Sequence, residues 1–292
     1  MKTVLVATDF SQASANALEY ALRLADGLNT GVALFSCYEY ISPPVNEVPV
    51  LMTMEELRDR TLLKLTETVN HIKRNDRASV DVYCKPGFAA EAILEIAREL
   101  NAELIITGMK KSAKGLRRLL GSTVSELARK TQIPMIVVPE EVRFNGLNSI
   151  ALANEGDLTQ DSDKNTLTVL RKIAEHFQSR LFIVRVAEGN LNQACELVNQ
   201  PTELINSIRE LDPAFKCVAG TSIPEALNEF INHHKIDMLA LLPHKHSLLE
   251  RLFFMSTTRA MVFETGIPLL IMPDSRITLT SHTTQHWEQI IL

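Results

Sequence analysis

Short aliphatic runs alternate along this chain with longer segments whose apolar residues recur at helical spacing. Residues 2–8 form such a run, and Ala17, Ala21, Leu24 and Leu28 then mark one face of a helix. The pattern predicts strands at 2–8, 32–38, 79–85, 104–107 and 135–138, with helices at 17–28, 54–73, 89–100 and 123–130. The strands are aliphatic throughout, which is typical of a parallel sheet covered on both faces. Right-handed crossovers then make a doubly wound open α/β sheet.

The chain contains this unit twice. Residues 102–139 align with residues 236–273 without a gap, and residues 18–39 align with residues 167–188. The second copy repeats the order of elements, with strands at 149–153, 181–186, 215–219, 238–242 and 269–272 and helices at 165–177, 193–211, 224–234 and 257–264. Where the copies differ, we expect one to have kept something that the other has lost.

The repeat divides the chain into two predicted domains, 1–140 and 149–273, followed by a tail over 274–292. Each domain ends on a short aliphatic strand, 135–138 or 269–272, with a proline on both sides. Such a strand would leave an open sheet edge. We therefore expect these two strands to meet across a pseudo-twofold axis within the chain.

Composition narrows the class of protein. The 292 residues are 46% hydrophobic and 22% charged, which is ordinary for a globular chain. A net charge of -5 gives no reason to expect nucleic-acid binding. No apolar run approaches the roughly 18 residues of a membrane span, and the N-terminus lacks the apolar core of a signal peptide. The four cysteines are scattered, so we expect reduced thiols and a cytoplasmic protein.

Candidate ligand-binding residues lie where the predicted strands end, which is where doubly wound sheets bind ligands. Thr8 and Asp9 follow the first strand, and Cys37 closes the second. After the fourth strand comes a basic, glycine-bearing loop over 108–122, and a helix begins at Thr123. Free amide groups and the positive end of a helix dipole favour an anion there.

Two further observations bear on this loop. Thr123 and Glu126 fit a capping box at the start of the helix. Neither common phosphate motif, G-x-x-x-x-G-K-[ST] or G-x-G-x-x-G, is present. The alternative interpretation is that the glycines end a strand and the lysines lie on a solvated loop.

At these residues the chain resembles the universal stress protein family. The likeness is carried by the opening Val-Leu-Val-Ala-Thr-Asp-Phe-Ser of residues 4–11, by residues 34–39 and by residues 108–139, and it extends over both copies. The resemblance implies a tandem member with two Rossmann-like, five-stranded parallel sheets in the strand order 3-2-1-4-5. It also implies that the two domains pair through their last strands.

The nucleotide-binding branch of that family has a glycine, two residues, a second glycine, nine residues, and then glycine with serine or threonine. Gly108 and Gly121-Ser122 stand at this spacing, but Lys111 takes the place of the middle glycine. Its ammonium can reach a phosphate, or its side chain can fill the place of the phosphate. Lys245 holds the same position in the second copy, which favours the second hypothesis.

The resemblance also implies a role for each end of the site. Asp9 corresponds to the residue that faces the adenine, and Cys37 to the residue that flanks it. Ser122 and Thr123 correspond to the residues that face phosphate. The predicted site for adenosine triphosphate (ATP) consists of Thr8, Asp9, Cys37, Gly108, Lys111, Gly121, Ser122 and Thr123.

The second copy departs from this pattern. Glu155 stands for Asp9, Leu242 for Gly108, Met255 for Gly121 and Ala260 for Glu126. A methionine where the backbone must approach phosphate fills the space that the ligand needs. We therefore expect ATP to bind, if at all, in the first copy.

Three hypotheses for the function follow. The first is a stress-response protein that acts as a nucleotide-responsive binding module. The second is a scaffold or interaction protein that binds no nucleotide. The third is a metal or small-ligand site in the second copy, where His244 and His246 lie in a loop and His233 and His234 lie near Asp237.

Catalysis is not expected from the sequence, although slow ATP hydrolysis stays open. The chain has no G-x-S-x-G motif. In the first copy a Ser-His-Asp arrangement would depend on His71, which falls on a long amphipathic helix.

Overall fold

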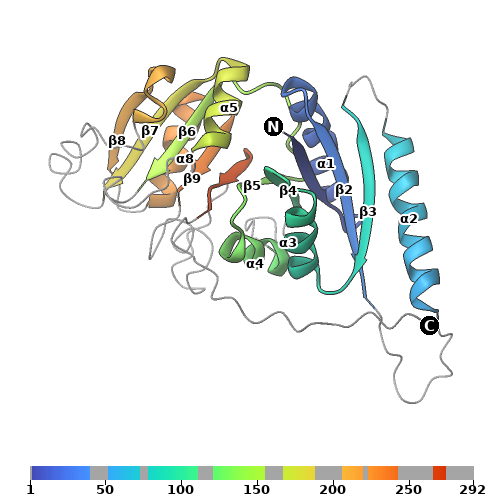
Figure 1. Ribbon diagram of the computed structural model, residues 1–292. Coiled ribbons are helices and arrows are strands. Elements are labelled where there is room, and N and C mark those ends of the chain that lie inside the picture. Colours follow the sequence, from blue (N-terminus) through green and yellow to red (C-terminus); the bar gives the residue numbers. More distant parts are fainter. Residues whose placement is uncertain are drawn as a thin grey trace.

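One continuous sheet organises the molecule (Figure 1). The computed structural model describes residues 2–39, 52–72, 78–110, 121–154, 167–187, 206–219, 223–242 and 266–273. Within them, ten strands follow one another in the order β3-β2-β1-β4-β5-β10-β9-β6-β7-β8. We call residues 2–139 the first half and residues 149–273 the second half. The strand order of one half is the reverse of the other, as a pseudo-twofold axis requires.

The first half has the predicted strand order. Its strands are β1 (Thr3–Ala7), β2 (Gly31–Tyr38), β3 (Val80–Pro86), β4 (Leu104–Met109) and β5 (Met135–Pro139). All neighbouring pairs within it are parallel. The order 3-2-1-4-5 is therefore confirmed, and β1 lies between β2 and β4 at the centre.

The second half repeats this order. Its strands are β6 (Ser149–Asn154), β7 (Arg180–Ala187), β8 (Ala214–Ala219), β9 (Met238–Leu241) and β10 (Leu269–Ile271). These strands are also parallel to one another. The order read from the edge is again 3-2-1-4-5, with β8 as the third strand and β10 as the last.

The two halves join through their last strands. β10 pairs antiparallel with β5, and Leu270 lies opposite Ile136. Both residues are fully buried. The join confirms the predicted pairing, and it removes two apolar sheet edges that would otherwise be open.

Helices cover both faces of the sheet. They are α1 (Gln12–Gly27), α2 (Met54–His71), α3 (Ala89–Glu99), α4 (Ser122–Lys130), α5 (Thr168–Phe177) and α8 (Ile223–His234), with a short 3-10 helix at Arg209–Leu211. Residues of α1, α2 and α5 share one hydrophobic cluster, and residues of α3, α4 and α8 share the other. No described helix is long and apolar enough to cross a membrane.

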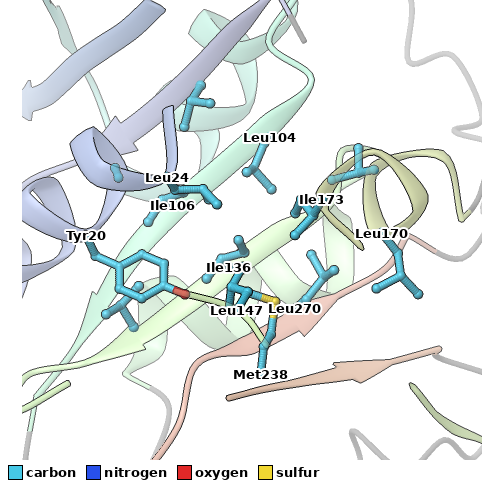
Figure 2. Close-up of a cluster of buried hydrophobic side chains, with 14 of the residues drawn as sticks. Tyr20, Leu24, Leu104, Ile106, Ile136, Leu147, Leu170, Ile173, Met238 and Leu270 are labelled. Carbon is cyan, nitrogen blue, oxygen red and sulfur yellow. The ribbon is translucent and has the colours of Figure 1, made fainter. Parts of the chain in front are cut away.

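The hydrophobic core is shared between the halves rather than divided into two. Figure 2 shows one cluster in which Leu24 and Ile106 of the first half lie near Ile173 and Leu270 of the second. The antiparallel join places α1 and α5 on the same face of one sheet, and buried residues of both helices belong to this cluster.

Polar and aromatic contacts between segments far apart in the chain also hold the fold together. The Lys172 ammonium of α5 lies 2.6 Å from the Glu103 carboxylate, just before β4. In the connection between the halves, the Phe144 ring packs edge-on against Tyr20, with ring centroids 5.1 Å apart. The Asp237 carboxylate accepts hydrogen bonds from the backbone N–H groups of Asn148 and Ser149, at 2.7 and 2.9 Å. These bonds position the first strand of the second half.

Candidate functional site

A cavity of about 520 Å³ opens at the carboxyl ends of the central strands of the first half. It lies beside β1, at the point where the strand order reverses and doubly wound sheets bind ligands. Its volume is in the range of small-molecule sites. Seven of the eight predicted site residues line it: Thr8, Asp9, Cys37, Gly108, Gly121, Ser122 and Thr123. The eighth, Lys111, lies outside the described residues.

Asp9 forms one end of the cavity and is already engaged. One carboxylate oxygen accepts a hydrogen bond from the Ser11 backbone N–H at 3.0 Å, and the other lies 2.7 Å from the Lys110 ammonium. Partial burial raises the pKa of the Asp9 carboxyl. The hydrogen bonds from Lys110 and Ser11 outweigh this effect and hold the pKa well below its usual range. Asp9 is therefore an ionised acceptor at neutral pH.

Thr8 connects the end of β1 to the first turn of α1. Its hydroxyl lies 2.9 Å from the Ser14 hydroxyl and accepts a hydrogen bond from the Phe10 backbone N–H at 3.0 Å. These bonds support Phe10, whose φ of 61° is in the left-handed region that bulky residues rarely adopt. Thr8 lines the cavity, but its hydroxyl makes hydrogen bonds within the turn between β1 and α1.

Gly108 and Gly121 are required for different reasons. A Cβ on Gly108 would lie 2.3 Å from the Ala13 carbonyl oxygen, so the close approach of α1 to the end of β4 requires glycine. A Cβ on Gly121 would meet nothing within 4 Å, and its φ of -60° suits any residue. The fold therefore explains Gly108, whereas Gly121 leaves space at the edge of the cavity.

The predicted capping box at the start of α4 is wrong. The helix begins at Ser122 with Gly121 as its N-cap, and no side chain caps it. Thr123 lies inside the first turn, and the Glu126 carboxylate instead lies 2.6 Å from Lys130. The first intrahelical hydrogen bond of α4 runs from the Ser125 N–H to the Gly121 carbonyl. The N–H groups of Ser122, Thr123 and Val124 come before this bond, so they have no partner within the helix, and these three residues line the cavity.

Cys37 lies at the opposite wall, near the end of β2. It is half-buried, and burial together with the nearby Glu39 carboxylate raises the pKa of its thiol. The thiol is therefore protonated at neutral pH and acts as a small apolar wall residue. Phe35 on the same strand and Ile93 on α3 extend this apolar wall.

Two polar residues that line the cavity lie in segments that the sequence indicated, the strand end at Thr107 and the basic loop, but they were not among the eight predicted site residues. Lys110, which pairs with Asp9, falls in the basic loop. Thr107 is a buried residue of β4 that lines the cavity. The repeat contains a signal for it, because the aligned residue of the second copy is Leu241.

A second hollow, of about 1100 Å³, lies between α1, α2 and the connection at Arg143 and Phe144. It is the larger of the two, but none of the predicted site residues line it. Its charged side chains are of both signs, with Arg23 and Lys64 beside Glu19 and Glu67. The smaller cavity is the better candidate because it lies at the strand ends and the N-terminus of α4.

The histidines of the second half do not form a metal site within the described residues. His234 stacks on Phe230, with ring centroids 4.3 Å apart. Asp237 is bonded to backbone N–H groups, as described above. No group of three or more His, Cys, Asp or Glu side chains in the described ranges is placed to hold a metal ion. His244 and His246 lie outside those ranges.

Comparisons with known proteins agree with this architecture. The model of the universal stress protein family matches residues 1–139. A universal stress protein of Synechocystis sp. is 24% identical over 296 residues, which cover 92% of this chain and 99% of that protein. The stress response protein NhaX of Bacillus subtilis is 24% identical over 160 residues, which cover 46% of this chain and 96% of that protein.

The fold has a close counterpart among solved structures. The crystal structure of a universal stress protein from Archaeoglobus fulgidus matches with a TM-score of 0.67 at 13% identity, covering 93% of this chain and 98% of that one. The family model thus accounts for the first half, and a relative of tandem length aligns over nearly the whole chain. Residues 1–139 therefore match the universal stress protein family, and the chain as a whole is similar to a universal stress protein of tandem length.

Proposed function

We propose that this protein acts in the stress response as a nucleotide-responsive binding module, with ATP held in the cavity of the first half. The names of the relatives support the stress response. The observation that carries the nucleotide proposal is that seven separately predicted residues line one cavity of suitable size. These residues come from β1, β2, β4 and the start of α4.

The chemistry of the two ends suits a nucleotide. At one end, the ionised Asp9 carboxylate accepts hydrogen bonds, as recognition of a base or a ribose requires. At the other, the first turn of α4 offers backbone N–H groups and the positive end of its dipole, which favour phosphate. Gly121 keeps the approach to these amides open. A base at the apolar wall and phosphates at α4 would then span the cavity.

In this proposal the second half is a structural partner. At the end of β9, which is equivalent to β4, Leu241 and Leu242 are both buried, where the first half has Thr107 and Gly108. Apolar side chains there offer no group to a polar ligand. Its contribution is the join through β10, which buries the edge of β5.

A scaffold that binds no nucleotide is the second candidate, and one observation favours it. The Asp9 carboxylate is bonded to Lys110 and Ser11, so a ligand must share or displace these partners. In a scaffold, this ion pair would serve to fix the end of β1 against the end of β4.

Mass spectrometry of small molecules released from the purified, denatured protein separates the two candidates. Calorimetric titration of the ligand-free protein with ATP is the companion measurement. We expect released adenine nucleotide, or saturable ATP binding at one site per chain. No released nucleotide and no heat of binding with millimolar ATP would favour the scaffold. Two sites per chain would contradict the structural role of the second half.

A further inference from the structure

The hydroxyl of Thr107 is buried, belongs to a residue that lines the cavity, and has no hydrogen-bond partner in the protein. Thr107 is 4% exposed and lines the cavity near the end of β4. Among the described residues, three other buried side-chain atoms also lack a hydrogen-bond partner, and they belong to Tyr20, Thr30 and Arg171. None of these three residues lines this cavity. Among these four residues, Thr107 alone combines an unpaired polar group with a place in the wall of the cavity.

The surroundings of Thr107 offer no partner for its hydroxyl. Its neighbours in register are Ala7 on β1 and Val137 on β5, and both pack in the hydrophobic cluster under α3 and α4. Ile93 of α3 and Val124 of α4 line the same part of the cavity. A hydroxyl buried among such groups is destabilising when it is unpaired.

The fold itself does not require this hydroxyl. The aligned residue of the second half is Leu241, which is fully buried at the same place in β9. The three residues that precede Thr107 in β4, Leu104, Ile105 and Ile106, are all aliphatic. The hydroxyl is thus present only in the half that has the described cavity, and it is unfavourable there in the absence of a ligand.

We infer that Thr107 is a specificity-determining residue whose hydroxyl bonds the nucleoside part of the ligand. The inference rests on the proposed nucleotide binding. Thr107 lies on the floor of the cavity, on the strand between Asp9 at the end of β1 and the first turn of α4. A neutral hydroxyl that can donate and accept suits a sugar hydroxyl or a base edge. The charged phosphates have the helix N-terminus instead.

This placement explains how the cavity would reject ligands of the right size but the wrong polarity. An apolar molecule would leave the buried hydroxyl unpaired, and a ligand with a matching polar group would satisfy it. The apolar walls supply affinity for a flat ring, and Thr107 supplies selectivity among such rings.

The substitution Thr107→Val tests the inference because it removes the hydroxyl and keeps the shape. Thr30→Val is the matched control: Thr30 is also buried, 7% exposed and unpaired, but it does not line the cavity. Thr131→Val is a second control, because the Thr131 hydroxyl is bonded to the Ile133 backbone at 2.7 and 3.0 Å. Urea unfolding and calorimetric titration with ATP and with adenosine are measured for all four proteins.

We expect Thr107→Val to weaken the binding of ATP and of adenosine by the same factor, roughly three- to tenfold. Without ligand, Thr107→Val and Thr30→Val should both raise the urea midpoint, since each removes an unpaired hydroxyl. Thr131→Val should lower the midpoint, because it leaves backbone groups unpaired. Neither control should change the affinity for ATP.

Three results would overturn the inference, and they are distinguishable. If Thr107→Val binds ATP and adenosine like the wild type, the inference fails while the proposed function stands. If the loss is confined to ATP and spares adenosine, the contact with the nucleoside part is wrong. If the wild type binds neither compound, the proposed function fails and the inference fails with it.

Discussion

Strands β4 and β9 occupy equivalent places in the two halves, yet their carboxyl ends differ. Near the end of β4, Thr107 and Gly108 lie beside the cavity, and Gly108 also lies against the first turn of α1. At the corresponding place of the second half lie Leu241 and Leu242, both buried in the hydrophobic clusters. The same topology thus supports a partly polar strand end beside a cavity in one half and buried leucines at the equivalent positions in the other.

This difference separates what the fold needs from what a ligand needs. Gly108 is required because any Cβ would collide with the backbone of Ala13. A leucine in its place, as in the second half, excludes the same approach of a helix to the strand. Gly121 has no such neighbour, so its absence of a side chain matters for the cavity alone.

The largest expected effect compares the same substitution at these two glycines. Gly108→Ala should lower the free energy of unfolding by about 3 kcal/mol, because either α1 or β4 must move away from the new Cβ. Gly121→Ala should change it by less than about 1 kcal/mol. Urea denaturation of both variants checks the difference. Equal stabilities would mean that the contact between Gly108 and α1 does not constrain the fold.

The next prediction gives the first half the residue of the second. Gly121→Met should reduce ATP affinity at least about tenfold, because the side chain enters the space before the amides of α4. The urea midpoint should stay close to that of the wild type, since a Cβ at Gly121 meets open space. Calorimetry with ATP measures the affinity. An unchanged affinity would place the nucleotide elsewhere.

A smaller effect concerns the ion pair that joins the halves. Lys172 and Glu103 are partly buried, and the hydrogen bond from Lys172 holds the pKa of the Glu103 carboxyl below its usual value. A double-mutant cycle with Lys172→Ala and Glu103→Ala should give a coupling energy of about 0.5–1 kcal/mol. A coupling of zero would show that the apolar core alone holds the halves together.

The smallest effect is the pH dependence of the Asp9 ion pair. Because its pKa is lower in the folded state, the unfolded state takes up the proton first as the pH falls. The stabilisation is therefore present above about pH 4, the ordinary pKa of aspartate, and is lost below it. Asp9→Asn should lower the stability at pH 7 by less than about 1 kcal/mol, because the pair is largely exposed. The difference in the free energy of unfolding between Asp9→Asn and the wild type should shrink at acidic pH and in 1 M salt. A difference that is constant with pH would contradict an ionised Asp9.

Much of the architecture could be predicted from the sequence because it depends on local patterns that occur twice. Aliphatic runs at regular intervals predict a parallel sheet, and the gapless repeat predicts a second copy of it. The short last strands, each between prolines, predict the join of β5 and β10. For the site, strand ends identify Thr8, Asp9, Cys37 and Gly108, because carboxyl ends of parallel strands share an edge. The helix start and the family motif add Gly121, Ser122 and Thr123, which line the same cavity.

Other features depend on contacts between distant segments, and only the tertiary structure decided them. The pairing of Lys110 with Asp9 and the collision that excludes a Cβ at Gly108 each involve residues far apart in the chain.

The prediction of a capping box was wrong for a local reason, because α4 begins one residue earlier than the sequence signal indicates.

For this protein, the sequence by itself determined the alternation of strands and helices, the repeat and the edge of the sheet where a ligand belongs, whereas the spatial order of the strands followed from the family resemblance. Periodicity and repetition are local properties, so they can be read along the chain. The tertiary structure alone decided that each of the two hydrophobic clusters draws on both halves, and that the Thr107 hydroxyl lies beside a cavity without a hydrogen-bond partner. Whether a polar group is paired depends on every element packed around it, and these elements come together only when the chain folds.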